Sequence, residues 1–121
     1  MKTCLIVDDS NVIRKVASHI LESLGCALNE AESGEAAIEH CQQQMPDVVL
    51  LDWNLPRMSG IDFITALRRL PNGQKPVVFY CTTENDPIDI ARALSAGGDD
   101  YIMKPYDRAG VQAKFVEAGL A

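Results

Sequence analysis

Acidic residues stand directly after an apolar run near the start of this sequence. Residues 4–10 read Cys-Leu-Ile-Val-Asp-Asp-Ser, so Asp8 and Asp9 follow a segment whose composition is typical of a buried strand. A second apolar run, Val48–Leu51, is followed in the same way by Asp52. Because an isolated charge is costly to bury, carboxylates that cluster in such positions need a cation or a proton beside them.

Three carboxylates gathered at one place would suit a hard divalent cation. Mg²⁺ typically takes one or two carboxylates, keeps several waters and leaves room for a phosphoryl oxygen. The pattern does not favour zinc, because no His or Cys accompanies the acidic residues. Thr82 and Lys104 follow two later apolar runs. A carboxylate flanked by Mg²⁺ and the Lys104 ammonium group could attack phosphorus, since phosphoryl transfer depends mainly on positioning and charge neutralisation.

The order of elements along the chain explains how these residues could meet. Apolar runs of strand type alternate with amphipathic helix patterns, and the strong runs are continuous, as in strands buried on both faces. The strand-type runs are Thr3–Val7, Val48–Leu51, Val77–Cys81 and Tyr101–Met103, with a weaker candidate at Ala27–Ala31. The expected helix caps are Ser10, Ser33, Ser59, Asp86 and Asp107, and the expected stops are Gly25, Pro46, Pro71 and Gly97.

Five such strand–helix units with short connections predict an α/β fold. We expect a parallel five-stranded sheet with helices on both faces, a flavodoxin-like, doubly wound (βα)5 sandwich of three layers. The strand order 2-1-3-4-5 is an expectation from this fold class. Ligands of such sheets bind beyond the carboxyl ends of the strands, where the strand order reverses. Asp8, Asp9 and Asp52 would crowd together there if the first and third strands are neighbours.

Each of these residues also has a simpler interpretation. Asp8 or Asp9 could cap the first helix, Asp52 could be an ordinary residue after a strand, and Lys104 could be a solvated charge. The simpler interpretation would be preferred for Asp8, Asp9 or Lys104 alone. The combination of all four at one edge of a sheet favours a site.

Composition narrows the class of protein. The 121 residues fit one domain, 1–121, and 47% hydrophobic residues are enough for a core. A net charge of -6 argues against nucleic-acid binding, which needs a basic face. The first apolar run is too short for a signal peptide or a membrane span, so we expect a cytoplasmic protein without membrane contact. The four cysteines are far apart and are expected to fill the core.

Four segments of the chain resemble the receiver domains of two-component response regulators. They read LIVDDS, VVLLDWNLPRMSG, CTT and YIMKPY, in that order and spacing along the whole chain. The similarity is greatest to single-domain, chemotaxis-type (CheY-like) members. It implies that Asp52 accepts a phosphoryl group from a phosphohistidine of a sensor histidine kinase or a histidine phosphotransfer protein. Such a domain is not an enzyme in the usual sense, because it catalyses only its own phosphorylation and dephosphorylation.

The resemblance also assigns the metal ligands and the residues around the phosphoryl group. Asp9 and Asp52 would bind Mg²⁺ together with the backbone carbonyl of Asn54, and Asp8 would act through a bound water. Lys104 would pair with the phosphoryl group, and its peptide bond to Pro105 would be cis.

The same resemblance implies a switch. The Thr82 hydroxyl would bond a phosphoryl oxygen, and Tyr101 would turn inward as Thr82 moves. The face formed by the fourth helix, fifth strand and fifth helix would then change shape for a downstream protein partner. This is a population shift between two packings of a monomer, without an output domain.

Several positions would set the lifetime of the phosphorylated state, and others depart from the family pattern. Asn54, Thr83 and Glu84 would set the lifetime of the phosphorylated state, and the branched side chain of Thr83 predicts moderate to slow self-dephosphorylation. Tyr106 stands where phenylalanine is frequent, and we expect its hydroxyl to face water. The arginines Arg57, Arg68 and Arg69 are expected to be solvated charges.

Four other interpretations remain to be weighed. The chain could be a receiver excised from a longer regulator, although Met1 and a complete fifth helix favour a single domain. It could be a pseudo-receiver that binds partners without phosphorylation, but the key residues are intact. A Mg²⁺-dependent phosphatase would need an acidic residue at Asn54 and a cap domain. A flavin carrier would need a phosphate-binding loop where DDSNVIRK would repel a phosphate.

Overall fold

The computed structural model describes residues 1–83 and 87–120. Its strands are β1 (Thr3–Val7), β2 (Ala27–Ala31), β3 (Val48–Asp52), β4 (Val77–Thr82) and β5 (Asp100–Met103). Its helices are α1 (Asn11–Ser23), α2 (Gly34–Gln43), α3 (Gly60–Arg69), α4 (Pro87–Ser95) and α5 (Arg108–Glu117). The predicted alternation of strands and helices is therefore confirmed, including the weak strand at Ala27–Ala31.

The helix starts follow from the side chains that precede them. Ser10, Ser33, Ser59 and Asp107 each accept a hydrogen bond from a backbone N–H in the first turn, and each has an extended backbone. These bonds satisfy N–H groups that have no partner inside the helix. The cap predicted at Asp86 lies outside the described residues.

All five strands are parallel and adopt the order β2-β1-β3-β4-β5. The flavodoxin-like arrangement is thus confirmed. The order reverses between β1 and β3, where Val7 pairs with Leu51. The carboxyl ends of these two neighbouring strands consequently bring Asp8 and Asp52 to the same edge of the sheet.

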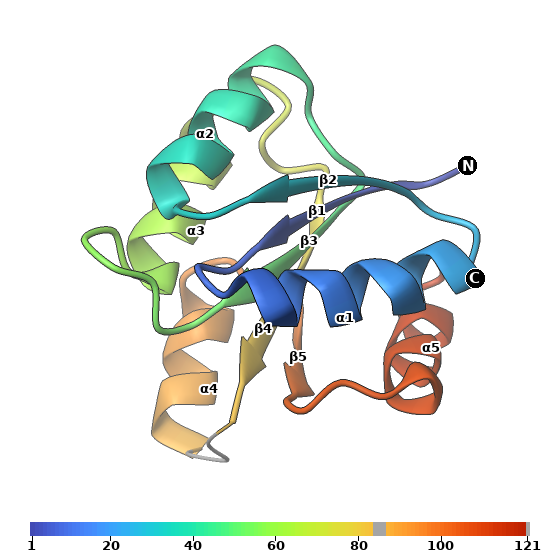
Figure 1. Cartoon of the computed structure of the whole chain (residues 1–121). Coiled ribbons are helices and arrows are strands. Elements are labelled where there is room, and N and C mark those ends of the chain that lie inside the picture. Colours follow the sequence, from blue (N-terminus) through green and yellow to red (C-terminus); the bar gives the residue numbers. More distant parts are fainter. Residues whose placement is uncertain (84–86, 121) are drawn as a thin grey trace.

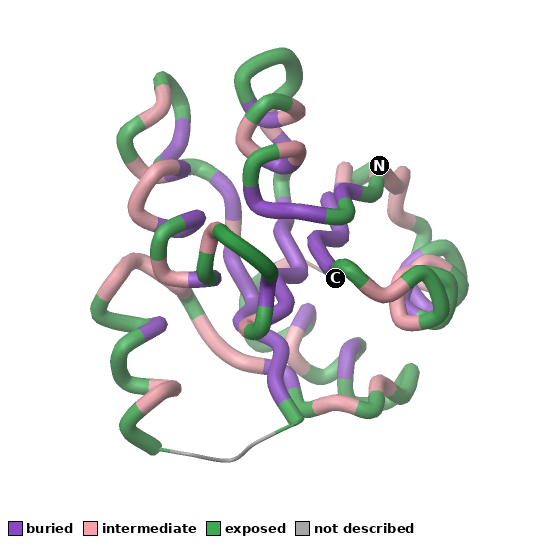
Figure 2. Tube along the Cα trace, turned by 60° about the vertical axis from the view of Figure 1, so that its left-hand side comes forward, coloured by how far each residue is buried: buried purple, intermediate pink, exposed green. Residues whose placement is uncertain are grey.

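Two hydrophobic layers hold the helices on the sheet. Figure 1 shows α1 and α5 on one face and α2, α3 and α4 on the other. Alternate residues of β1 pack into one or the other hydrophobic layer, because successive side chains of a strand point to opposite faces of the sheet. Cys4 and Ile6 pack with α1 and α5, whereas Leu5 and Val7 pack with α2 and α3. Figure 2 shows the buried stretches running through the central strands.

The apolar residues of α1 are only partly buried. Ala17, Ile20 and Leu21 face the core, but Val12 is 69% exposed and Val16 is 41% exposed. The sheet covers a narrower stripe of α1 than its apolar residues span. Cys4, Cys41 and Cys81 are buried free thiols, as predicted, and Cys26 is partly exposed. None of the described helices combines the length and the hydropathy that a bilayer crossing requires.

Candidate functional site

The Lys104 ammonium group joins two of the predicted carboxylates. Its Nζ donates to Asp8 Oδ2 at 2.7 Å and to Asp52 Oδ1 at 2.8 Å. All three side chains are largely withdrawn from solvent, with Lys104 only 9% exposed. Ion pairs at such short distances and in such shelter are charge-assisted hydrogen bonds of the strong kind. The ammonium group that was expected beside the acidic residues is therefore there.

The three predicted acidic residues share one small region. Asp8, Asp9 and Asp52 each offer a carboxylate oxygen, and these oxygens lie within 4.8 Å of one another. Asp8 and Asp52 are buried, while Asp9 is exposed. Three carboxylates against one ammonium group leave an excess of two negative charges, which one divalent cation would neutralise. The all-oxygen donor set, open to solvent on the side of Asp9, fits Mg²⁺.

Local hydrogen bonds fix the orientation of Asp8. Its Oδ1 accepts the backbone N–H of Ser10 at 2.9 Å, and its own N–H donates to the carbonyl of Ala31 at 3.1 Å. The Arg14 guanidinium donates to the Asp8 carbonyl at 2.7 Å. The turn between β1 and α1 thus directs this carboxylate towards Lys104, and the remaining carboxylate oxygen is the one that Lys104 contacts.

Arg14 was not singled out from the sequence. Besides the Asp8 carbonyl, it contacts Glu30 at 3.0 Å and Asn11 at 2.7 Å. Its place in the first turn of α1, five residues after Asp9, is the only sequence signal that could have indicated this role. Arg14 ties the β1–α1 turn to β2 and so supports the position of Asp8.

Burial has the largest effect on the pKa of Asp52. Removal from water raises the pKa of this carboxyl, and the Lys104 hydrogen bond and charge offset only part of that rise. The negative charge of Asp8 raises the same pKa further, whereas the backbone N–H of Asn54 lowers it. The surroundings of Asp52 therefore disfavour its charged form, and a bound cation would stabilise that form.

The contact with Lys104 lowers the pKa of Asp52, whereas the contacts with Asp52 and Asp8 raise the pKa of Lys104. Burial lowers the pKa of the ammonium group, but hydrogen bonds to Asp52 and Asp8 outweigh burial and raise it overall. Lys104 thus stays a cation at neutral pH, as charge neutralisation at this site requires.

The remaining predicted site residues fall around this centre. Thr82 ends β4 and is 5% exposed, and its carbonyl accepts the Lys104 N–H at 2.8 Å. The Lys104–Pro105 peptide bond is cis, as expected. Thr83 and Asn54 are exposed beside the site. Glu84, predicted to tune the phosphorylated state, lies outside the described residues.

Tyr101 stands on β5, one of the three elements of the predicted output face. It is partly exposed, and the ammonium group of Lys114 lies 4.4 Å from the centroid of its ring. Lys114 also contacts both carboxylate oxygens of Asp100 at 3.2 Å. The ring is therefore held near the surface by a neighbouring cation.

Two predictions need correction, one beside the site and one away from it. The Tyr106 hydroxyl does not face water: the ring packs against the core, and the hydroxyl lies beside the thiol of Cys81. Burial accordingly raises the pKa of the Tyr106 hydroxyl and raises that of Cys81 to about 12. Arg68 is not a solvated charge either, because its side chain is only 12% exposed and bonds to three backbone carbonyls.

Comparison with known proteins agrees with this geometry. Residues 4–115 match the response regulator receiver domain. The phosphate regulon transcriptional regulatory protein PhoB of Escherichia coli is 38% identical over 102 residues, covering 84% of this chain and 44% of PhoB. The chain thus spans less than half the length of this curated relative.

Solved structures of other proteins have the same fold as this chain. The chemotaxis protein CheY4 of Vibrio cholerae superposes with a TM-score of 0.91 at 28% identity, covering 97% of this chain and 98% of CheY4. The receiver domain of the sensor histidine kinase PA1611 of Pseudomonas aeruginosa has a TM-score of 0.87 at 28% identity, covering 96% and 95%. That receiver domain is described with a magnesium ion coordinated in its active site cleft. With its sheet order, its acidic edge and its match over residues 4–115, this chain belongs to the response regulator receiver domain family.

Proposed function

We propose that this chain is a phosphorylation-operated switch whose phosphoryl acceptor is Asp52. The observation that carries the proposal is the double contact of Lys104 with Asp8 and Asp52 beside an acidic trio. This arrangement supplies a nucleophile, a fixed cation and a set of oxygen ligands in one place, which are the parts that phosphoryl transfer requires.

The resident metal in this proposal is Mg²⁺. Asp9, Asp52 and the carbonyl of Asn54 would hold the ion, and Asp8 would contact it through water. When bound, Mg²⁺ supplies positive charge against the oxygens of the phosphoryl group. The excess of negative charge among the described acidic residues, and the magnesium ion described for the PA1611 receiver domain, support this assignment.

The proposed transfer uses residues of this chain in distinct roles. An Asp52 carboxylate oxygen attacks the phosphorus of a phosphohistidine, so an O–P bond forms as the P–N bond breaks. The P–N electron pair returns to the histidine nitrogen, which takes a proton from water and leaves as neutral imidazole. Lys104 already contacts the attacking carboxylate and can pair with the charge that arrives. Membership of the receiver family supports a sensor histidine kinase or a histidine phosphotransfer protein as the donor.

The proposed output is a change of surface. Thr82, at the end of β4, would bond a phosphoryl oxygen, and Tyr101 would then leave its place beside Lys114 and turn inward. The face of α4, β5 and α5 would thereby present a different shape to a downstream protein. Phosphorylation acts by stabilising one of two packings, so the chain is a switch that reacts only with itself and its donor rather than an enzyme that turns over a separate substrate.

Intact mass measurement tests the proposal directly. We expect incubation with acetyl phosphate and MgCl₂ to add the mass of one phosphoryl group, and the addition to be lost with excess EDTA. Asp52→Asn should abolish the addition, whereas Asp62→Asn, which removes an exposed carboxylate from α3, should not. An unchanged mass of the starting protein, or equal phosphorylation of the Asp52→Asn variant, would contradict the assignment.

A further inference from the structure

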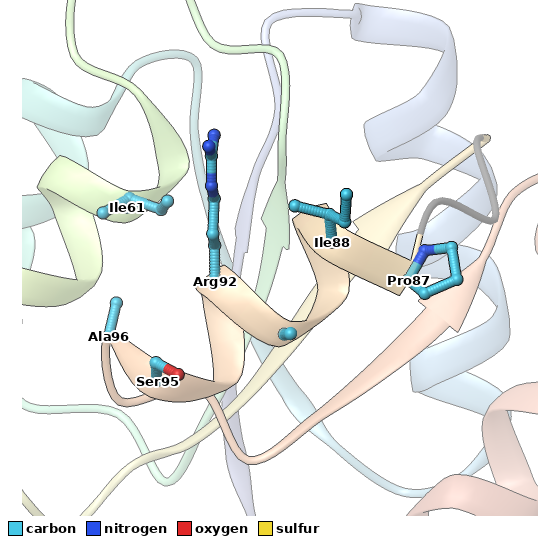
Figure 3. Close-up of a pocket in the computed structure, with 7 residues that line it drawn as sticks. Ile61, Pro87, Ile88, Arg92, Ser95 and Ala96 are labelled. Carbon is cyan, nitrogen blue, oxygen red and sulfur yellow. The ribbon is translucent and has the colours of Figure 1, made fainter.

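A groove separates α3 from α4 on the face of the sheet opposite to α1 and α5. It offers about 640 Å³ and opens to solvent. Figure 3 shows Ile61 on the α3 side and residues of α4 on the other side. The lining residues are Ile61, Pro87, Ile88, Ala91, Arg92, Ser95 and Ala96. The acidic trio and Lys104 do not line this groove, so it is a surface separate from the proposed phosphorylation site.

The groove exists because α4 turns a partly apolar face away from the sheet. In the described chain, Ala93 is the one buried residue of this helix. Ile88, Ala91, Arg92 and Ser95 recur at the spacing i, i+3, i+4 and i+7, so they share one side of α4. The side chain of Ile88 is 65% exposed on that side. Exposed apolar side chains beside an open groove form a surface that a partner can cover.

Arg92 gives the groove its chemical character. It is the only charged residue among those that line the groove, and Figure 3 shows its side chain standing between Ile61 and Ile88. Within residues 1–83 and 87–120, its guanidinium group makes no hydrogen bond or ion pair. Arginine favours carboxylate partners, which it can bind through two parallel hydrogen bonds. The chain itself carries a net charge of -6, so this guanidinium is a local exception on an acidic molecule.

We propose that the groove between α3 and α4 docks an amphipathic helix of a partner protein. The apolar side of that helix would lie against Ile61 and Ile88, and one carboxylate would pair with Arg92. The remainder of its exposed face would be neutral or basic, because the net charge of -6 repels an acidic partner. The surface does not require phosphorylation of Asp52, so its test is independent of the proposed switch.

A displayed library of helical peptides tests the proposal. Peptides selected on the immobilised chain should share two or three apolar residues at helical spacing and one acidic residue among them. Titration of a selected peptide into ¹⁵N-labelled protein should shift the amides of Ile88, Ala91 and Ser95. Ala91→Phe, which fills the groove, should remove this binding. An amide spectrum of the variant as well dispersed as that of the parent would show that it is folded.

The role of the Arg92 charge can be tested against a matched control at Arg69. Arg92→Glu should weaken binding of the acidic peptide by about tenfold or more, and replacing the acidic residue of the peptide by Lys should restore it. Arg69→Glu makes the same charge change on the exposed side of α3 and should leave the affinity within about twofold. The proposal is wrong if selected helices bind elsewhere, if no helix is selected, or if Arg92→Glu has no larger effect than Arg69→Glu. Concentration-dependent shifts of the same amides without peptide would instead assign the groove to a second copy of this chain, and would also overturn it.

Discussion

At the scale of single residues, the site places a carboxylate where its charge is costly. Burial raises the pKa of Asp52, and Lys104 offsets only part of that effect. The folded state therefore holds the Asp52 proton more tightly than the unfolded state does. The stabilising contribution of this group is fully present below the unfolded pKa and is lost as the pH rises through the folded pKa. At neutral pH without metal, the acceptor carboxylate works against folding.

Asp52→Asn should consequently stabilise the metal-free protein at pH 7. We expect a gain of roughly 0.5–2 kcal/mol, the usual scale when a strained functional group is neutralised. The gain should shrink as the pH falls below the ordinary carboxyl range, because Asp52 is then protonated in both states. Urea unfolding in EDTA at pH 7 and at about pH 3, below the ordinary carboxyl pKa of about 3.9, measures both values. A destabilised variant at pH 7 would show that the pair with Lys104 outweighs the burial of Asp52.

Thr83 provides a second prediction at this scale, which rests on the proposed function. Its branched side chain is exposed and follows Thr82. In the proposed function it would shield an acyl phosphate on Asp52 from water. Thr83→Ala should speed the decay of the phosphorylated protein by roughly threefold, or about 0.7 kcal/mol of barrier. Loss of phosphorus signal after removal of the phosphodonor gives the rate. A decay rate equal to that of the parent would show that Thr83 does not affect the lifetime of the phosphorylated state.

At the scale of elements, Arg68 holds three segments together at the edge of the sheet opposite to the acidic site. From α3 it donates to the carbonyls of Gly97, Gly73 and Pro76 and contacts the carboxylate of Asp99. The carboxylate of Asp99 in turn accepts the backbone N–H of Val78 at 2.8 Å. Arg68 thus fixes the segment between α4 and β5, and with it the end of α4.

Arg68→Ala should cost about 2–3 kcal/mol of unfolding free energy, because three carbonyls lose a charged donor. Arg68→Lys should recover only part of that loss, since one ammonium group cannot reach partners that the guanidinium fork spans. Arg69→Ala, next to it and exposed, should stay within about 0.5 kcal/mol. Chemical denaturation of the three variants gives these values, and equal effects at positions 68 and 69 would contradict the role assigned to Arg68.

The sequence predicted elements well and the direction of long side chains poorly. Strand runs, helix caps and the edge that gathers Asp8, Asp52 and Lys104 follow from periodicity and from the handedness of strand–helix–strand units. Arg68 looked like a solvated charge because its partners, Gly97 and Asp99, are 29 and 31 residues away in the chain. Tyr106 was placed in water for the same reason. Where a polar tip points depends on tertiary partners, which local patterns do not contain.

At the scale of the whole molecule, the acidic edge and the excess of acidic residues act together. The net charge of -6 concentrates cations around the chain, and the trio of Asp8, Asp9 and Asp52 offers them one defined place. The acidic trio does not line the groove of α3 and α4, which carries a lone guanidinium. The molecule therefore presents two surfaces of opposite local charge that could be occupied at the same time.

Binding of Mg²⁺ at the acidic edge should stabilise the entire domain, because a ligand that binds only the folded state shifts the unfolding equilibrium. At a concentration of about 100 times its Kd, the gain is about 2.7 kcal/mol. Asp9→Asn is the sharpest variant for this test, since Asp9 is exposed and its loss should leave metal-free stability nearly unchanged while removing most of the gain. Asp62→Asn, which also removes one exposed carboxylate, separates a bound ion from general screening by salt. If MgCl₂ stabilises the Asp9→Asn and Asp62→Asn variants equally, the stabilisation comes from the net charge and the acidic trio does not hold the ion.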